Sequence, residues 1–387
     1  MAYSAILRRC RAVRSLIPGY GRESRGEESK VVGWGRGWVA MFNKRSNHLF
    51  LSDPISHRIT DLPLIDTLPN PGITRNVSKV VLSSSPEDGE CRAMMMFGPT
   101  NRLAFCVPGH SSEWTPIGDP FFDSADFSSP FERYARVQED LVYCTRRKVF
   151  TTITAGSLNP RDFFFAHPFT RFAAEICHLD IQDPNSPKIV RSDWPPQTRL
   201  GQEGKTVVWG EENHELLEKE CIQTLHLVYA EQSDQLFVVV RYVQLVDGLG
   251  RPLGFVPRRK DDGGLHGGPL LGKTYGFIVM ELMDCIEKDK RWSRECNRYH
   301  EMDVVDDLNG MAMFVGVNNH SFAIPIHDRH YQQLFNPNSI YFTDAKRIKT
   351  RVSVVNDTGV FDYATKTVSP ISPSSLACST QCLMTLL

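Results

Sequence analysis

Short β-strand patterns separated by turn-forming residues run through most of this chain and constrain its fold more than any other feature. Stretches rich in β-branched and aromatic residues recur, and turn formers such as those at 85–89 and 357–359 separate them. The stretches with this pattern are 31–42, 48–51, 79–83, 93–97, 103–107, 141–143, 149–153, 221–229, 235–243, 277–282, 311–317, 321–324, 340–342, 352–355 and 360–363. They predict an all-β fold.

The extent of this pattern points to one large architecture. About 340 residues of hairpins without a linker exceed one β-sandwich and match six or seven blades of roughly 50 residues each. We therefore predict a single kelch-like β-propeller over residues 31–369 and an irregular tail over 370–387. Helical patterns are short, and the best candidates are residues 213–219 and 328–334.

Connections between the predicted strands fall into two kinds. Residues 230–234 and 318–320 are short polar loops, which we predict to join pairs of strands into β-hairpins. Pro/Gly-rich insertions at 183–204 and 248–273 are predicted to be long blade loops, where propellers carry variable recognition surfaces. The charged residues of the second insertion include Arg258, Arg259, Lys260, Asp261 and Asp262.

Charges are segregated along the chain. The 44 Lys and Arg residues nearly balance 45 Asp and Glu, and this net charge of −1 argues against a nucleic-acid partner. Five of the basic residues nevertheless lie in residues 1–22, which contain no acidic residue. Removing these five leaves 39 basic against 45 acidic residues, a net charge of −6. Uninterrupted apolar runs are at most five residues long, so no membrane insertion is predicted.

Residues 1–30 are predicted to be an organellar targeting segment that begins as a short amphipathic helix. Apolar side chains fall on one helical face and arginines on the opposite one. The apolar residues are Ile6, Cys10, Val13 and Ile17, and the arginines are Arg8, Arg11 and Arg14. Arg-rich, acid-poor amphipathic starts are typical of transit peptides. We expect the import machinery of mitochondria, or of chloroplasts as well, to recognise residues 1–22; a cytoplasmic or nuclear location is the alternative.

Several spaced motifs near the C-terminus carry a family resemblance. Residues 310–325 (GMAMFVGVNNHSFAIP) are followed by 336–344 (NPNSIYFTD) and 357–362 (DTGVFD). Together with an apolar hairpin pattern at 227–242, they resemble the plant F-box-associated β-propeller family, a KIB-type propeller and a domain of unknown function. The resemblance covers roughly residues 31–369.

Most members of that family resemble F-box proteins, in which an F-box recruits a ubiquitin ligase and the propeller holds the client. This chain is similar to the organelle-directed subgroup without an F-box, because an Arg-rich leader stands before the first predicted blade. The resemblance implies a non-enzymatic interaction protein in mitochondria that binds an unidentified protein partner. The alternative is a substrate-recognition component that works with a ubiquitin ligase in the cytosol or nucleus.

One motif competes with this interpretation. Residues 267–274 (GGPLLGKT) match the phosphate-binding pattern G-x-x-x-x-G-K-[ST], in which Lys273 and Thr274 would contact a nucleotide. Such a loop needs a buried strand before it and a helix after it, whose N-terminus meets the phosphates. Here a charged, Gly-rich stretch precedes the motif, and residues 275–282 have a strand pattern. A P-loop nucleotide-binding protein is therefore a remote alternative.

The remaining candidate residues are interpreted as structural, so no catalytic residue, cofactor or metal site is predicted. Gly33, Gly35 and Gly37 lack the full dinucleotide-binding spacing and are expected to allow close packing near the propeller axis. A group of histidines close in sequence lacks the spacing of a helical metal pair. These histidines are His320, His327 and His330.

Acidic and sulfur-containing residues lead to the same interpretation. Asp306 and Asp307 are adjacent, so they point to different sides of an extended chain and are expected to be solvated turn residues. The ten cysteines are irregularly spaced, and Cys378 and Cys382 have no second ligand pair at a zinc-like spacing. We interpret the cysteines as buried thiols in a reducing compartment.

The signature residues near the C-terminus are assigned to the fold. Tyr341 and Phe342 are expected to pack on opposite faces of one strand. Asn338 and Asp344 are expected to cap the turns at its ends. The family pattern itself therefore predicts architecture and not a binding site.

Overall fold

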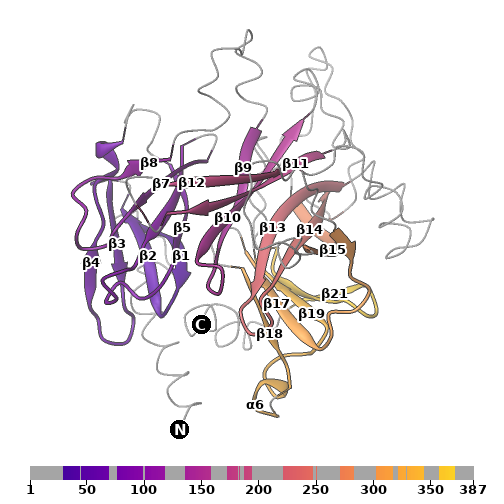
Figure 1. Ribbon diagram of the computed structural model, residues 1–387. Helices are drawn as coiled ribbons and strands as arrows, with labels where there is room; N and C mark the ends of the chain where they lie inside the picture. Colours follow the sequence, from indigo (N-terminus) through magenta and orange to yellow (C-terminus); the bar gives the residue numbers. More distant parts are fainter. Residues whose placement is uncertain are drawn as a thin grey trace.

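A computed structural model gives the fold of the chain (Figure 1). The residues that it describes are 29–43, 45–68, 76–98, 101–117, 136–157, 172–181, 183, 187–193, 221–246, 250, 271–282, 302–316, 321–327, 329–343 and 357–370. They form an all-β structure with two short helical turns, η1 (Ile65–Thr67) and α6 (Arg329–Gln332). Across these ranges, no helix has the length and apolar character needed to cross a membrane.

Three four-stranded antiparallel sheets follow one another along the chain, and each is a meander in which strands that are consecutive in sequence pair. The first sheet contains β1 (Ser29–Gly35), β2 (Trp38–Asn43), β3 (His48–Ser52) and β4 (Ile59–Asp61). The second contains β5 (Val77–Leu82), β6 (Ala93–Phe97), β7 (Arg102–Cys106) and β8 (Thr115–Pro116). The third contains β9 (Arg136–Cys144), β10 (Val149–Ser157), β11 (Phe172–Asp180) and β12 (Lys188–Asp193).

The remaining described strands form one nine-stranded sheet of order β16-β15-β14-β13-β18-β17-β19-β20-β21. Its first part repeats the meander with β13 (Cys221–Ala230), β14 (Gln235–Val246), β15 (Leu271–Leu282) and β16 (Met302–Val304). Its second part contains β17 (Met311–Val315), β18 (Phe322–Pro325), β19 (Ser339–Phe342), β20 (Gly359–Asp362) and β21 (Thr367–Pro370). A parallel contact between Tyr229 of β13 and Phe322 of β18 joins the two parts.

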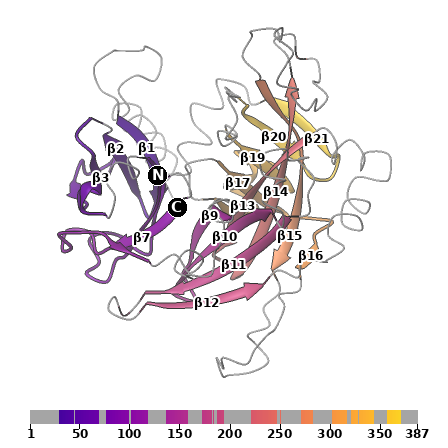
Figure 2. The same ribbon diagram turned by 90° about the horizontal axis from the view of Figure 1, so that it is seen from above.

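The sheets are arranged around a common centre (Figure 2). The first strands of successive sheets are neighbours, with β1 beside β5, β5 beside β9, and β9 beside β13. Radial sheets whose first strands surround an axis are the architecture of a propeller. The all-β propeller prediction is therefore confirmed, whereas the number of six or seven blades stays a prediction.

Hydrophobic clusters fill the spaces between neighbouring groups of strands, and among the described residues they connect these groups in a closed cycle. Residues from neighbouring groups of strands that belong to the same cluster include Phe42 and Met95, Met96 and Phe150, Val142 and Leu227, and Phe237 and Met313. The last cluster joins the two ends of the described chain. We call it the closing seam; its members include Trp34, Val39 and Met41 from the first sheet, and Phe314, Phe322, Phe335 and Tyr341 from the C-terminal part.

In the part of the chain that the structure describes, the two ends are joined by this packing. Among the described strands, β1 pairs with β2 and β21 pairs with β20, so neither end adds a strand to the other. Aromatic rings fill the seam instead: Phe314 stacks on Tyr341 with centroids 5.0 Å apart and on Phe322 at 4.8 Å. Burial of large aromatic side chains from both partners is what holds these two ends together.

The inner strands approach one another closely near the axis. β1, β5 and β9 each contain a register shift, after which Gly33, Lys79 and Asp140 resume the pairing. A Cβ atom on Gly33 would lie 2.2 Å from the carbonyl oxygen of Val80, so only glycine allows β1 to approach β5 this closely. The prediction that this glycine permits close packing near the axis is confirmed.

Several strand boundaries differ from the predictions. The stretch 31–42 is a hairpin and not one strand, because Arg36 and Gly37 have φ angles of 56° and 81° and form the two-residue turn between β1 and β2. Lys188–Asp193 of the predicted loop 183–204 is strand β12, since it pairs with β11. Leu271–Lys273 of the predicted loop 248–273 likewise belongs to β15 and pairs with β14. Strands were also missed at β4, β8, β11, β16 and β21.

Other predictions are confirmed or lie outside the described residues. The 230–234 loop joins β13 to β14, and β17 pairs antiparallel with β18, as predicted for the hairpin around 318–320. Helix α6 lies inside the helical prediction at 328–334. Residues 1–28, 213–219, 352–355 and 371–387 lie outside the described ranges.

Candidate functional site

The predicted binding loops lie mainly outside the described residues. Of residues 248–273, the described ones are Gly250 and the first residues of β15. The charged group from Arg258 to Asp262 lies outside, as do residues 184–186 and 194–204 of the other insertion. The candidate sites among the described residues are therefore the charged residues and the signature residues of the strands and turns.

The phosphate-loop motif does not have the surroundings that a nucleotide needs. Its residues Leu271–Thr274 lie in β15, which pairs with β14 and continues to Leu282. Lys273 is exposed and Thr274 is buried, as expected for alternate residues of a strand. Because a strand and not a helix follows the motif, no helix N-terminus is available to meet a phosphate there. The predicted strand at 275–282 is confirmed.

Thr274 has a structural role instead. It donates a hydrogen bond to Oδ2 of Asp357 at 2.5 Å and accepts one from Nε of Arg241 at 2.8 Å. The Arg241 guanidinium is fully buried, lies 2.8 Å from Oδ2 of Asp357 and donates to the carbonyl oxygen of Thr343. It also lies 4.7 Å from the centre of the Phe342 ring. This network ties β14 and β15 to the C-terminal strands, so motif residues far apart in sequence stabilise one interface.

The signature residues around β19 also serve the fold. Tyr341 packs in the closing seam, while Phe342 packs in the cluster on the other face of the strand, as predicted. The Tyr341 hydroxyl accepts a hydrogen bond from the Asn336 amide at 2.8 Å, and burial raises the pKa of this phenol. Asn338 has a φ of 53°, and its side chain accepts from the Gly310 amide at 2.7 Å. Its predicted turn-capping role is confirmed, whereas Asp344 lies outside the described residues.

The other candidates have structural environments where they are described. Asp306 and Asp307 are exposed, and Asp307 accepts from the Asn309 amide in a turn, as predicted. His327 is exposed, and neither His320 nor the His330 side chain is among the described positions. Nowhere in the described ranges do three His, Cys, Asp or Glu residues come together as a metal site would require.

The described cysteines are buried thiols, as predicted. They are Cys91, Cys106, Cys144, Cys177 and Cys221. Burial raises the pKa of the Cys91 and Cys106 thiols, which lie in the cluster between the first two sheets. Their thiols therefore stay protonated and are poor nucleophiles. Cys378 and Cys382 lie outside the described residues.

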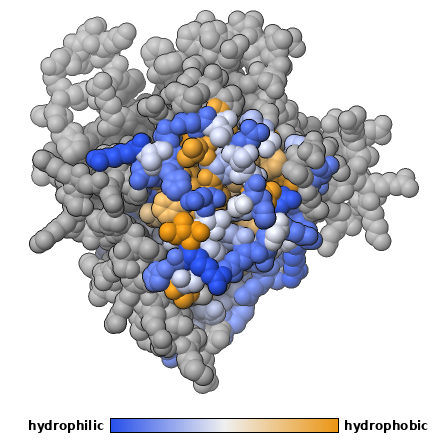
Figure 3. Space-filling model, turned by 90° about the vertical axis from the view of Figure 1, so that its left-hand side faces the viewer, coloured by the Kyte–Doolittle hydropathy of each residue, from blue (hydrophilic) through white to orange (hydrophobic). Residues whose placement is uncertain are grey.

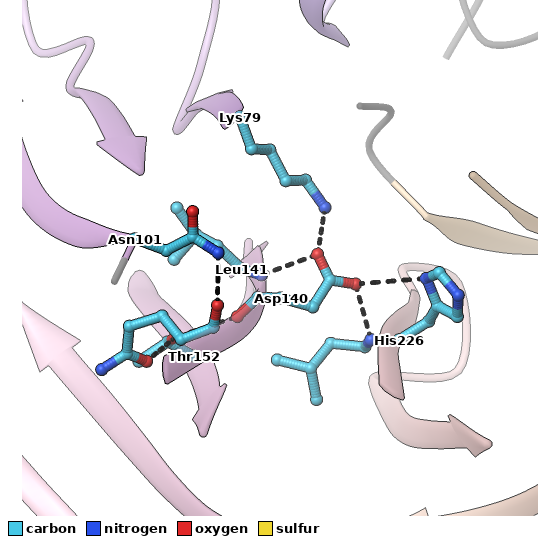
Figure 4. A network of polar contacts seen from close by, with 8 residues as sticks. Lys79, Asn101, Asp140, Leu141, Thr152 and His226 are labelled. Atoms are coloured by element: carbon cyan, nitrogen blue, oxygen red, sulfur yellow. Dashed lines mark hydrogen bonds and ion pairs between the residues drawn. The ribbon is translucent and has the colours of Figure 1, made fainter. Parts of the chain in front are cut away.

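A buried group of charged residues lies where three inner strands meet (Figure 4). Asp140 of β9 accepts from Nζ of Lys79 of β5 at 2.5 Å, and its other oxygen accepts from the backbone amide of Leu227 of β13 at 2.8 Å. Nδ1 of His226 is 4.0 Å from the same oxygen. Burial alone would raise the pKa of Asp140, but Lys79 and His226 outweigh it and hold this pKa below its ordinary value.

Sequence reasoning missed this group. Lys79 and Asp140 are 61 residues apart, and no spacing rule connects residues on different sheets. The available signal was a lysine inside the apolar strand pattern of β5, since lysine is almost never fully buried unless it is paired. The carboxylate of Asp140 pairs with Lys79, with the Leu227 amide and with His226. We therefore interpret this group as one that positions the three inner strands.

Turns from three sheets meet at one end of the ring and form the surface that we call the hairpin rim, residues 36–37, 145–148 and 231–234. Nη1 of Arg36 lies 3.1 Å from Oε1 of Glu231, which joins the β1–β2 turn to the β13–β14 turn. The Tyr229 hydroxyl donates to Asp234 at 2.6 Å, and Arg146 donates to the carbonyl oxygen of Gln232 at 3.1 Å. The rim is therefore a fixed surface built from distant parts of the chain.

The hairpin rim carries more positive than negative charge. Its basic side chains are Arg36, Arg146, Arg147 and Lys148, and its acidic ones are Glu231 and Asp234. Arg146, Lys148 and Glu231 are exposed. Burial and the hydrogen bond to Asp234 raise the pKa of Tyr229, so this tyrosine remains a neutral hydrogen-bond donor. Fixed charged turns with an exposed surface suit the recognition of another macromolecule.

Comparisons with known proteins give a family and a distant structural likeness. The family model described as the KIB1-4 beta-propeller matches residues 12–362. This match begins ahead of β1, inside the predicted targeting segment. No curated protein matches the chain. Among solved structures, the PQQ-bound form of Aldose Sugar Dehydrogenase (Adh) from Streptomyces coelicolor is similar, with 10% identity and a TM-score of 0.24 over 72% of this chain and 99% of that chain.

Proposed function

Because the chain belongs to the KIB1-4 β-propeller family, we propose that it is a non-enzymatic interaction protein that binds a protein partner. The observation that carries this proposal is the hairpin rim, where side-chain contacts hold turns from three sheets in place. A surface that is already ordered loses little conformational entropy on binding. Since the rim has more basic than acidic side chains, we propose an acidic segment as the feature of the partner that it recognises.

The long insertions extend the same proposal. Residues 183–204 and 248–273 were expected from the sequence to form the recognition loops, and the second contains Arg258, Arg259 and Lys260. We propose that the parts of these insertions outside β12 and β15 add contacts specific to the partner on a second surface, because the connection between β14 and β15 leaves the sheet at the end opposite the β13–β14 turn of the rim. Replacing these three basic residues with alanine should weaken capture of the partner while leaving the thermal unfolding midpoint unchanged.

Crosslinking tests the rim directly. A photoreactive amino acid at Arg146 or Lys148, both exposed, should crosslink to one protein in cells, whereas the same group at exposed Arg45 in the β2–β3 turn should not. The double variant Arg146→Glu/Lys148→Glu should lose the partner, and Arg45→Glu should keep it. Equal crosslinking at both turns, or none at the rim, would contradict the proposal.

For the compartment, we propose import into mitochondria, or into chloroplasts as well, through residues 1–22. The support is the acid-free segment with five arginines. A fluorescent fusion of residues 1–40 should enter the organelle, and a matched fusion in which Arg8, Arg11 and Arg14 are replaced by glutamate should not. A fusion of residues 1–11 separates a leader from the part matched by the family model, which begins at residue 12. Cytosolic or nuclear fluorescence of the 1–40 fusion would reject import.

A second candidate function rests on the family itself, which is associated with F-box proteins. In this alternative, the chain is a substrate-recognition component linked to a ubiquitin ligase in the cytoplasm or nucleus. Co-purification of the full chain with a ubiquitin-ligase scaffold, together with a cytosolic 1–40 fusion, would favour this alternative. The two experiments therefore distinguish the candidates.

A further inference from the structure

The large hydrophobic side chains that the structure shows as exposed all lie in one short part of the chain. They are Ile55, Ile59 and Leu64, which are 46%, 65% and 48% exposed. They surround β4, the outermost strand of the first sheet. Figure 3 faces the side of the molecule on which β3, β4 and β8 lie, and it shows hydrophobic residues set among hydrophilic ones. Isolated exposed apolar residues are normal on protein surfaces, so these three side chains do not by themselves indicate a binding surface.

The backbone of β4 has hydrogen-bonding groups on both of its edges. The Leu62 amide donates to Leu49 and the Arg58 carbonyl accepts from Asp53, so these groups face β3. Backbone groups alternate in direction along an antiparallel strand, so the N–H and C=O groups of Ile59 and Asp61 face outward. No described strand pairs with this outer edge. The edge therefore offers two residues with exposed side chains whose outward backbone groups pair with no described strand.

The side chains at these two positions define what could pair with them. Ile59 and Asp61 are two residues apart and lie on the same face of the sheet. The Asp61 side chain is 73% exposed, although it contacts Nε2 of His48 at 3.1 Å. A strand added beside β4 would place an apolar residue next to Ile59 and, two positions along, a basic residue next to Asp61.

A second copy of this chain does not supply that combination. Antiparallel pairing of two β4 strands through their outward groups would oppose Ile59 to Asp61, or each residue to its own copy. The first arrangement sets an apolar side chain against a carboxylate, and the second sets one carboxylate against another when Asp61 is at the centre. When Ile59 is at the centre, Asp61 would lie opposite His57, but His57 has a φ of 57° and lies in the turn before β4, so the strand does not extend to that pair. Like charges directly opposite each other on a sheet are unfavourable. The charge at this edge therefore favours a different molecule.

We propose that β4 is a docking edge for an extended segment of a partner protein with an apolar and a basic residue two positions apart. The segment would add a strand to the first sheet by main-chain hydrogen bonds to Ile59 and Asp61. Strand addition of this kind gains affinity from the backbone and specificity from alternate side chains. This surface is separate from the hairpin rim, so the proposal stands independently of the proposed function. The shortness of β4 and the charge of Asp61 protect the edge from indiscriminate pairing.

Peptide binding to the full-length chain tests the proposal. The probe is the fluorescein-labelled peptide Val-Thr-Lys-Thr-Val-Thr-Lys-Thr, and the matched control carries glutamate in place of lysine. We expect the lysine peptide to bind about fivefold more tightly, on the scale of one exposed ion pair. The Asp61→Lys variant should reverse this preference, and Ile59→Pro should abolish binding of both peptides, because it removes an outward N–H and an apolar contact without removing a bond to β3. Leu64→Ser, also exposed but outside the strand, should change little.

Hydrogen exchange distinguishes strand addition from general adhesion. Binding of the lysine peptide should slow exchange of the Ile59 and Asp61 amides and leave the Leu62 amide, which already bonds to β3, unchanged. Failure of the lysine peptide to bind, equal affinity for the two peptides, or binding without slower exchange at Ile59 and Asp61 would each overturn the proposal. Far-ultraviolet circular dichroism of each variant confirms that loss of binding does not reflect unfolding.

Discussion

The interface between the third sheet and β13 is held together differently from the closing seam. At the first, one buried carboxylate, that of Asp140, contacts Lys79 of β5 and the backbone of Leu227 in β13. At the closing seam, the described contacts are aromatic, with Phe314 between Phe322 and Tyr341. β5, β9 and β13 are thus joined by directional polar contacts in addition to apolar packing, whereas the contacts described between the two ends of the chain are apolar.

This difference matters because the two kinds of contact respond differently to change. A buried ion pair loses most of its value when one partner is removed, since the other remains charged and desolvated. Aromatic packing loses free energy in proportion to the area and cavity involved. A single substitution should therefore lower the free energy of unfolding more at the polar interface than at the closing seam.

The largest effect is expected at Asp140. The Asp140→Leu variant leaves Lys79 buried without its carboxylate, and we expect it to lower the free energy of unfolding by about 3–5 kcal/mol. Urea denaturation followed by tryptophan fluorescence measures this loss. The double variant Lys79→Met/Asp140→Leu removes both charges and should be clearly more stable than the single one. If the double variant is less stable than the single one, the ion pair is not the source of the loss.

A smaller loss is expected at the closing seam. Phe314→Leu keeps an apolar side chain but loses the stacked contacts, and about 1–2 kcal/mol of stability should go with them. Hydrogen exchange should then quicken in β1, β2 and β17 more than in β9 and β13. Faster exchange distributed equally over both regions would contradict the idea that the seam opens on its own.

The acid response should also separate the two interfaces. The folded-state pKa of Asp140 lies below its unfolded value of about 3.9. The carboxylate therefore contributes stability that is present above that pH and is lost as the pH falls through the folded-state pKa. The unfolding midpoint of Asp140→Asn should depend less on pH below about pH 4 than that of the native chain or of Phe314→Leu. If the unfolding midpoints of all three proteins depend equally on pH in this range, protonation of Asp140 is not the cause of the acid response.

The smallest effect is expected at Lys273. Its side chain is exposed on β15, so Lys273→Ala should change stability by less than about 0.5 kcal/mol, whereas Thr274→Val, which breaks bonds to Arg241 and Asp357, should cost about 1–3 kcal/mol. Thermal unfolding with and without ATP and magnesium should give the same midpoint for the native chain and Lys273→Ala. Stabilisation by ATP that Lys273→Ala abolishes would support the phosphate-loop alternative instead.

Strand prediction from the sequence succeeded where burial is nearly continuous. β6 and β17 are wholly apolar and β13 and β14 are mostly apolar, and all four were predicted. β4, β8 and β21 were missed because they are short strands at sheet edges, with mostly exposed and polar residues. Such edges carry too little hydrophobic pattern to be recognised, and their pairing depends on the strand already present beside them.

The contacts between buried polar residues could not be predicted from local sequence patterns. The predicted strand 141–143 begins one residue after Asp140, so the residue that joins three strands was left outside the pattern. Arg241 and Asp357 each lie in a motif that carried the family resemblance, yet their contact spans 116 residues. Neither pair follows a local period, since each joins different strands through tertiary packing.

By itself, the sequence determined the strand-rich class of fold, the family resemblance and the segregation of five arginines at its start, because local composition and period carry that information. Tertiary structure alone decided that Lys79, Asp140 and His226 meet, that Thr274 belongs to a structural network, and that Ile59 and Asp61 stand at an open edge. The physical reason is that a propeller builds its interfaces between sheets. Residues that meet there are set by how whole sheets pack around the axis, and no local spacing encodes that geometry.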